Sequence, residues 1–174
     1  MNFPFLSSLI LLPFIGALFI FFTRNNKENN ITVKYVALFT SIVNFFLSIY
    51  LWILFDQSTS EFQFVEDREW IEGIINYKVG IDGISILFVI LTTFITPLCI
   101  ISVNNSIKDR LSEFLIAVLV MESFMIGVFC SLDLVVFYLF FEAGLIPMFL
   151  IIGIWGGARR VYSAFKFFLF TLLG

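Results

Sequence analysis

Residues 134–155 read LVVFYLFFEAGLIPMFLIIGIW, a run in which Glu142 is the one charged side chain. A membrane-spanning helix needs roughly 20 predominantly apolar residues, and this run has that length. An ionisable group at the centre of a bilayer costs at least about 2.5 kcal/mol, so such groups usually face a bundle interior or a wet cavity on an ion pathway. The stretch therefore predicts a transmembrane helix and marks Glu142 as a candidate for proton chemistry.

The composition of the whole chain agrees with this stretch. Of the 174 residues, 60% are hydrophobic and 13% are charged, and the mean hydropathy is +1.04. A soluble domain is about 45–50% apolar and about 25% charged, and a chain this short leaves much of its surface exposed. The composition excludes an ordinary soluble globular domain and predicts an all-α polytopic membrane protein, with residues 1–174 as a single membrane domain.

Other apolar runs predict the remaining spans. Four of them are long enough to cross a bilayer, at residues 5–22, 35–55, 84–102 and 114–130. A sixth run, 161–174, would form a helix of about 21 Å, which is shorter than a hydrocarbon core of about 30 Å. We expect five full transmembrane helices and a truncated sixth, so either the last helix stops half-way or it continues in another polypeptide.

The basic residues predict the orientation. They gather in the first, third and fifth connections, as Arg24, Lys27, Lys34, Lys108, Arg110, Arg159 and Arg160. Loops rich in Lys and Arg stay on the inner side of the membrane, which places the N-terminus outside. The first span has no basic residue before it, unlike a signal peptide, so a bacterial protein or one made inside an organelle is expected.

The second connection, residues 56–83, carries an excess of acidic residues on the predicted outer side. Residues 61–66 alternate between polar and apolar side chains, as in a half-exposed strand. Residues 74–79 are able to pair with them in a small acidic hairpin, and an irregular loop is the alternative. Asp82 is expected to cap the next helix, with Gly80 and Gly83 easing the turn.

Three ionisable residues lie inside the apolar runs: Glu122, Glu142 and Lys166. Pro147 has no N–H to donate to the carbonyl of Ala143, which leaves an acceptor beside Glu142 where water can be held. Glu122 is central in its span. For both acids the structural alternative is a neutral carboxyl that ties two helices together. Lys166 is either a partner in a channel or an anchor that extends to the inner surface.

Other kinds of site have little support in the sequence. Histidine is absent, and Cys99 and Cys130 lie in apolar runs without the spacing of metal ligands, which argues against a haem, zinc, copper or iron–sulfur site built by this chain. The net charge of −3, with no basic cluster, argues against a nucleic-acid partner. No phosphate-binding loop or nucleophile motif is present.

Several stretches together resemble one family. They are GIDGIS at 80–85, LTTF at 91–94, LVVFYLFFE at 134–142, LIPM at 145–148, GIWG at 153–156 and KFFLFT at 166–171. They are similar to the antiporter-like subunit 4 of proton-translocating NADH dehydrogenase (respiratory complex I), called the M subunit in bacteria. The resemblance covers nearly the whole chain and is weakest in the first two spans.

The resemblance implies the N-terminal part of a fourteen-helix antiporter-like fold. It assigns Glu142 to the fifth-helix glutamate of the family's proton-transfer axis, Glu122 to a fourth-helix glutamate and Lys166 to a sixth-helix lysine of bacterial members. The implied function is a membrane-arm subunit of NADH:ubiquinone oxidoreductase that contributes to proton translocation. No redox centre is expected in this chain, because NADH, FMN, iron–sulfur clusters and quinone are bound by other subunits.

The resemblance also implies partners and a location. The expected partners are other membrane-arm subunits of complex I, a second chain carrying the remaining helices, and lipid. The expected location is the mitochondrial inner membrane, with the bacterial inner membrane as the alternative and the N-terminus on the intermembrane-space or periplasmic side. Alternatives are a subunit of a related cation/proton antiporter or membrane-bound hydrogenase, or a non-pumping structural fragment within the complex.

Overall fold

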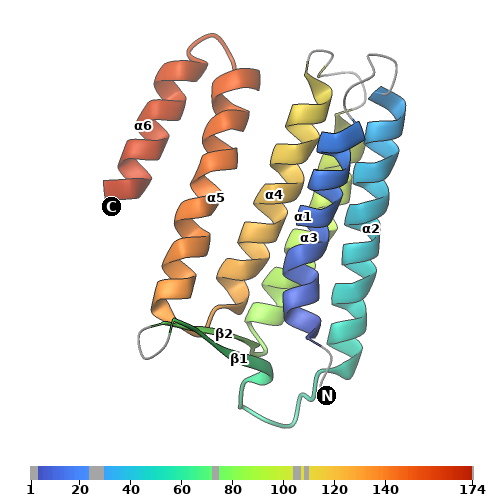
Figure 1. Cartoon of the computed structure of the whole chain (residues 1–174), viewed down its shortest axis with the longest axis vertical. Helices are drawn as coiled ribbons and strands as arrows, with labels where there is room; N and C mark the ends of the chain where they lie inside the picture. Colours follow the sequence, from blue (N-terminus) through green and yellow to red (C-terminus); the bar gives the residue numbers. More distant parts are fainter. Residues whose placement is uncertain (1–3, 24–29, 72–74, 104–106, 108–109, 174) are drawn as a thin grey trace.

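The computed structural model describes residues 4–23, 30–71, 75–103, 107 and 110–173 (Figure 1). In that part of the chain the helices are α1 (Phe5–Thr23), α2 (Asn30–Leu54), α3 (Ser85–Ser102), α4 (Leu111–Cys130), α5 (Leu134–Trp155) and α6 (Arg160–Leu173). The first five are long and apolar enough to cross a membrane. The predicted all-α polytopic fold, with a sixth helix of 14 residues, is confirmed.

The predicted spans and the observed helices differ mainly at their starts. The prediction for α5 agrees at both ends, whereas α2 begins at Asn30 rather than at residue 35, and α4 begins at Leu111 rather than at residue 114. The predictions followed apolar runs. Backbone hydrogen bonding continues into the more polar residues before each run, because the i to i−4 pattern does not depend on hydropathy.

Helix α4 lies at the centre of the arrangement. It packs against α1, α2, α3 and α5, while α6 packs on α5 (Figure 1). It is also the most buried of the five spanning helices. Helices α1 to α4 therefore form a four-helix bundle, and α5 and α6 form an antiparallel pair attached to one side of it.

Strands β1 (Gln63–Ile71) and β2 (Ile75–Ile81) form an antiparallel hairpin across one end of the bundle (Figure 1). The hairpin, and not the irregular loop, is the structure of this connection. The alternation at 61–66 placed β1 too early, because the pairing is irregular between Gln63 and Glu66, where Phe64 has a positive φ of 53°. A local irregularity of this kind is typical of a bulged strand.

The hairpin is fastened to the helices at several points. Val79 pairs with Ser131, and the Leu132 N–H donates to the Lys78 carbonyl at 3.0 Å, which ties the turn between α4 and α5 to β2. Gly80 lies inside β2, and a Cβ there would be 2.7 Å from the Leu132 side chain. Its role is therefore this close approach rather than the turn that the sequence predicted.

Glu66 of β1 caps the N-terminus of α1. Its Oε1 accepts hydrogen bonds from the N–H groups of Leu6 at 2.9 Å and Ser7 at 3.3 Å, and its Oε2 accepts one from the Ser7 hydroxyl. The first N–H groups of a helix lack partners within the helix, and a carboxylate there also complements the helix dipole. Tyr77 of β2 lies 3.2 Å from the Ser7 hydroxyl, and burial at this junction raises the pKa of its phenol.

Asp82 caps the start of α3, as the sequence predicted. Its Oδ1 accepts from the N–H groups of Ser85 at 2.7 Å and Ile84 at 3.1 Å. The Ser85 hydroxyl oxygen in turn accepts from the Asp82 N–H at 2.8 Å, which is the reciprocal pattern of a capping box. The hydrogen bonds from Ser85, first among them the one from its backbone N–H, hold the pKa of the Asp82 carboxyl below its usual range.

The charged residues separate between the two ends of the bundle. Lys34, Arg110, Arg159 and Arg160 lie near the helix ends opposite the hairpin, whereas the acidic connection lies at the hairpin end (Figure 1). Arg24, Lys27 and Lys108, which also entered the orientation argument, lie outside the described residues. The described arrangement has the alternation of ends that the charge pattern predicted.

We expect Glu66→Ala to lower the free energy of unfolding by about 0.5–2 kcal/mol, because it leaves the first N–H groups of α1 without their cap. Asp67→Ala is the matched control. Asp67 is the next residue in β1, and its 3.7 Å ion pair with Lys78 is exposed on both sides, so its removal has little effect. Heat denaturation of the detergent-solubilised chain, followed by circular dichroism, measures both. Equal losses in the two variants would contradict the capping role.

Candidate functional site

A polar stripe runs along one face of α2. Ser41, Asn44 and Ser48 follow one another at spacings of three and four residues, which places them on the same side of the helix. All three are fully buried, although the rest of this helix is largely apolar. The stripe therefore faces the interior of the four-helix bundle.

Glu122 of α4 meets this stripe. Its side chain is 1% exposed, and its Oε1 accepts a hydrogen bond from Asn44 Nδ2 at 2.9 Å. The other oxygens of the two side chains, Glu122 Oε2 and Asn44 Oδ1, are buried and have no hydrogen-bond partner among the described residues. A titratable carboxyl is thus held between α2 and α4 with half of its hydrogen-bonding capacity unused.

Further hydroxyl groups surround this pair. The Ser48 and Thr93 hydroxyls lie 2.7 Å apart and join α2 to α3, and the Ser123 hydroxyl donates to the Ile10 carbonyl of α1. Thr96 donates to the carbonyl one turn earlier in α3. We call the buried polar residues together the polar layer; they are Ser41, Asn44, Ser48, Thr93, Thr96, Glu122 and Ser123.

Two hydrophobic clusters enclose the polar layer along the helix axes. The cluster toward the hairpin includes Leu9, Leu51, Val89 and Ile126, and the cluster toward the opposite end includes Ala17, Ala37, Ile100 and Leu119. Along α2, α3 and α4, the members of the polar layer fall between these two sets of residues. On α1, Ile10, whose carbonyl accepts from Ser123, belongs to the cluster toward the hairpin. The polar layer is therefore at mid-depth in the bundle, in surroundings of low polarity that strengthen electrostatic interactions.

Glu142 lies elsewhere, on α5. It is partly buried, and Tyr138 lies one turn earlier on the same face of the helix. Glu142 precedes Phe149 by seven residues and so shares its face of the helix, and Phe149 contacts Phe165 of α6 with ring centroids 5.3 Å apart. Glu142 is therefore on the side of α5 that faces α6.

The structure does not bring Glu122 and Glu142 together. Glu122 faces α2, whereas α4 contacts α5 through Phe124 and Gly127, two and five residues further along. Two residues correspond to about 200° around a helix, so Glu122 and the surface that contacts α5 lie on opposite sides of α4. The two acids occupy separate environments within the described part of the chain.

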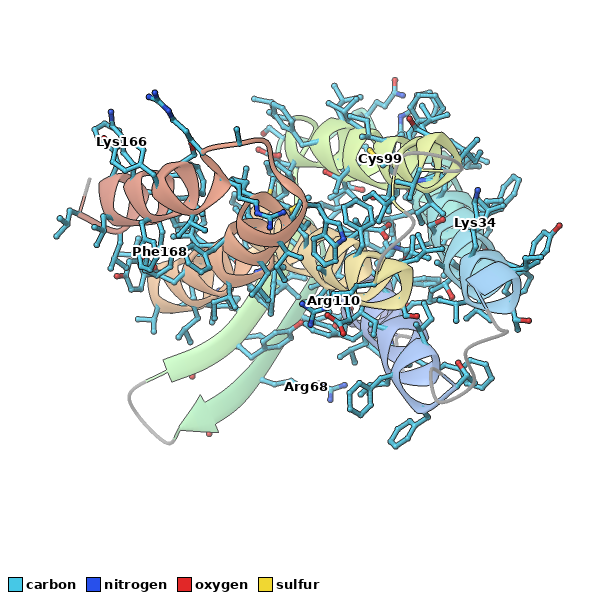
Figure 2. All side chains as sticks on the ribbon, turned by 90° about the horizontal axis from the view of Figure 1, so that it is seen from above. Lys34, Arg68, Cys99, Arg110, Lys166 and Phe168 are labelled. Atoms are coloured by element: carbon cyan, nitrogen blue, oxygen red, sulfur yellow. The ribbon has the colours of Figure 1, made fainter. Side chains whose placement is uncertain are left out.

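Lys166 is exposed on α6. It lines a shallow cavity of about 380 Å³ together with Leu169, Phe170 and Leu173, and Figure 2 shows it directed away from the bundle. It is not near the polar layer, which belongs to α2, α3 and α4. Of the three predicted site residues, Glu122 is thus the one that the bundle encloses.

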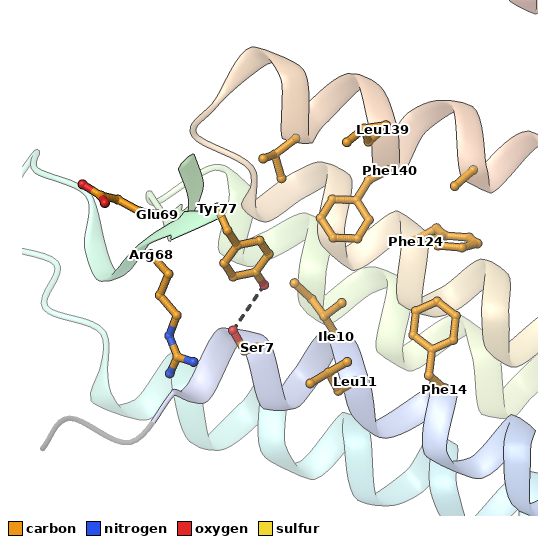
Figure 3. Close-up of a pocket in the computed structure, with 12 residues that line it drawn as sticks. Ser7, Ile10, Leu11, Phe14, Arg68, Glu69, Tyr77, Phe124, Leu139 and Phe140 are labelled. Carbon is orange, nitrogen blue, oxygen red and sulfur yellow. Dashed lines mark hydrogen bonds between the residues drawn. The ribbon is translucent and has the colours of Figure 1, made fainter. Parts of the chain in front are cut away.

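An apolar groove lies where α1, α4 and α5 meet. At the hairpin end a cavity of about 680 Å³ is lined by α1, α4 and α5, with Ser7, Arg68, Glu69 and Tyr77 at its polar side (Figure 3). A second cavity of about 620 Å³ continues toward Arg110. Both are lined mainly by hydrocarbon, and among the described residues no group of three His, Cys, Asp or Glu side chains is placed to hold a metal ion.

Sequence reasoning missed Asn44 and the hydroxyl residues of the polar layer. The sequence does contain a pattern that indicates this polar face, because Ser41, Asn44 and Ser48 recur at helical spacing within the apolar run 35–55. Polar residues at that spacing in a membrane span indicate a face turned toward other helices. The partner of Glu122 was not visible, because Asn44 is 78 residues away in the sequence.

Five apolar spanning helices, four of which enclose an acid, define a polytopic membrane protein with an ionisable interior. The family model described as "NADH:quinone oxidoreductase/Mrp antiporter, TM" matches residues 131–174. Chain 4 of NADH-ubiquinone oxidoreductase from Marchantia polymorpha is 48% identical over 171 residues, 97% of this chain and 34% of that protein. Subunit M of NADH-quinone oxidoreductase from Rhodobacter capsulatus is 61% identical over 141 residues, 81% of this chain and 27% of that protein.

Over nearly its whole length the chain is similar to subunits of NADH:quinone oxidoreductase that are named chain 4 or subunit M. It spans about a third of the length of the curated relatives it matches, such as subunit M of Rickettsia prowazekii, of which it covers 35% at 47% identity. A chain in the structure of a membrane-bound sulfane sulfur reductase, an archaeal respiratory membrane complex, has the same fold. The TM-score is 0.75 at 19% identity, over 97% of this chain and 25% of that one.

We expect Gly127→Ala to destabilise the packing of α5 on α4, because a Cβ there would lie 2.7 Å from the Phe140 ring. Overpacking costs about 1–3 kcal/mol, which outweighs the gain of about 1 kcal/mol in helix propensity. Gly144→Ala is the control, since its Cβ would lie at an ordinary 3.6 Å from Phe124. Heat denaturation in detergent should show a loss of stability for Gly127→Ala and none for Gly144→Ala. The same change of stability in both variants would refute the close contact.

Proposed function

We propose that this chain is part of the proton-translocating membrane arm of NADH:quinone oxidoreductase, and that electron transfer from NADH to quinone takes place in other subunits. The family relation, the five spanning helices and the enclosed acid support this function. The observation that carries it is Glu122, a titratable group that is 1% exposed and surrounded by polar side chains at mid-depth.

The chemistry of the polar layer suits proton transfer. A carboxyl group takes up and releases a proton without any cofactor. Serine and threonine hydroxyls both donate and accept hydrogen bonds, so the pair Ser48 and Thr93 is able to reorient when a neighbouring group changes its protonation. Because an ionisable residue inside a membrane span is energetically costly, such a residue is by default a candidate functional residue.

Glu142 and Lys166 are proposed as further proton-transfer groups. Both match the family's motifs, and both lie in apolar helices. Tyr138, one turn before Glu142 on the same face of α5, supplies a second polar group near this acid. Because Glu122 and Glu142 lie on opposite sides of α4, each is proposed to act in its own polar environment rather than in direct contact.

The proposed partners are other membrane-arm subunits and lipid. The large exposed apolar side chains of α5 and α6 support such neighbours. This chain is proposed to bind no redox cofactor of its own. The proposed location is the mitochondrial or bacterial inner membrane, and the separation of charges between the two ends supports an N-terminus and hairpin on the outer side.

We expect Glu142→Gln to lower proton pumping severalfold at nearly normal assembly, because Gln fills the same space but carries no titratable proton. Glu142→Asp should retain more activity, since it keeps the acid about one methylene further back. Proton uptake by vesicles during NADH oxidation, normalised to assembled complex, measures this effect. Glu61→Gln, an exposed change in the acidic connection, is the matched control and should pump at the wild-type rate.

Higher proton pumping in Glu142→Gln than in Glu142→Asp would indicate a structural role for Glu142. If Glu142 only tied helices together, Gln would be the better replacement and Asp the worse one. A Glu142→Gln variant that pumps at the wild-type rate would overturn the proton-relay role of this residue and favour a non-pumping structural subunit.

A further inference from the structure

The Asn44–Glu122 pair leaves two buried oxygen atoms without partners, and both belong to the same two side chains. Asn44 Nδ2 donates to Glu122 Oε1 at 2.9 Å. The unpaired atoms are the remaining oxygen of each group, Asn44 Oδ1 and Glu122 Oε2. Buried polar atoms without partners are rare in folded proteins, and each one calls for a physical explanation.

The protonation state of Glu122 accounts for both atoms at once. An ionised carboxylate only accepts hydrogen bonds, as does the amide oxygen of Asn44, so no hydrogen bond forms between these two oxygen atoms. A proton on Oε2 turns that oxygen into a donor, and Oδ1 is the free acceptor on the partner that already binds the other half of the carboxyl. A single proton thus gives both oxygen atoms a hydrogen-bond partner.

The surroundings of the pair also favour the neutral acid. The other members of the polar layer are serines and threonines, and their described hydrogen bonds go to backbone carbonyls and to each other. The polar layer contains no basic side chain. The described lysines and arginines belong to the two ends of the bundle, to the hairpin and to α6. A carboxylate in this position would lack a compensating charge.

We propose that Asn44 is a positioning residue that recognises the protonated form of Glu122, with Nδ2 donating to Oε1 and Oδ1 accepting the hydrogen carried by Oε2. Loss of the proton breaks the second of these bonds and leaves the first. The amide therefore distinguishes the acid from the ion, which a serine or an aspartate in its place does not do in the same way. The role of this recognition in proton transfer rests on the proposed function, but the paired hydrogen bonds do not.

Infrared spectroscopy of the assembled complex in membranes tests the proposal through the C=O stretch of protonated carboxyl groups. The Glu122 band is the difference between the wild-type and Glu122→Gln spectra. We expect a Glu122 band that disappears in Glu122→Gln, shifts on exchange into deuterated water and lies at the low frequency of a doubly hydrogen-bonded acid. Asn44→Leu, which removes both bonds at similar volume, should move the band to higher frequency. Asn44→Gln keeps the amide and should return it part of the way.

Ser48→Ala is the control for the infrared measurement, because Ser48 lies in the same layer but is hydrogen bonded to Thr93 rather than to Glu122. Its Glu122 band should stay at the wild-type position. Absence of any Glu122-dependent band in the wild-type complex would overturn the proposal without the need for an Asn44 variant, and so would an unchanged band in Asn44→Leu.

Proton uptake measured on the same samples separates this proposal from the proposed function. If the Glu122 band responds to the Asn44 variants as expected but Glu122→Gln pumps at the wild-type rate, a transfer role for Glu122 is contradicted and the recognition by Asn44 stands. Pumping lost in Glu122→Gln, with no band shift in Asn44→Leu, would leave the function standing and refute the recognition.

Discussion

The hydrogen bond from the Asn44 amide to the Glu122 carboxyl holds α2 against α4 at the middle of the bundle. In the hydrocarbon core of a bilayer no water is available to hydrogen bond with polar groups, so these groups must form hydrogen bonds within the protein. This requirement turns the stripe of Ser41, Asn44 and Ser48 inward and makes α4, which carries Glu122, the helix that the others surround. The hydrophobic clusters on either side then complete the bundle.

The hairpin fixes one end of this arrangement. Glu66 satisfies the first N–H groups of α1, and residues of β2 bind the turn between α4 and α5. Helices α5 and α6 are attached less extensively, with broad apolar faces exposed. The bundle of α1 to α4 therefore encloses Glu122 fully, while Glu142 and Lys166 belong to the more open part of the described chain.

Local features were predictable from the sequence, and partnerships across the bundle were not. The run 134–155 defined α5 to the residue, and the Asp82 cap needs only neighbours three residues away. The contacts of Glu66 with α1 and of Asn44 with Glu122 join residues about 60 and 78 positions apart. Helices such as α1 and α5 are apolar all round, so no stripe in their sequence showed which side faces a neighbour.

The same limit applies to the candidate site. The sequence was sufficient to select Glu122, Glu142 and Lys166, because a charge in an apolar span is conspicuous. Whether these residues meet depends on the rotation of each helix about its axis. Glu122 and the face that contacts α5 differ by two residues, and that difference alone places the two acids on opposite sides of α4.

The central claim is that the enclosed carboxyl of Glu122 carries protons. The most direct measurement is the number of protons translocated per NADH oxidised by the assembled complex in sealed vesicles, compared between wild type, Glu122→Gln and the exposed control Glu61→Gln. The account predicts a ratio clearly below wild type for Glu122→Gln, with normal assembly, and an unchanged ratio for the control. A wild-type ratio in Glu122→Gln would contradict it and reduce the Asn44–Glu122 pair to a structural tie between two helices.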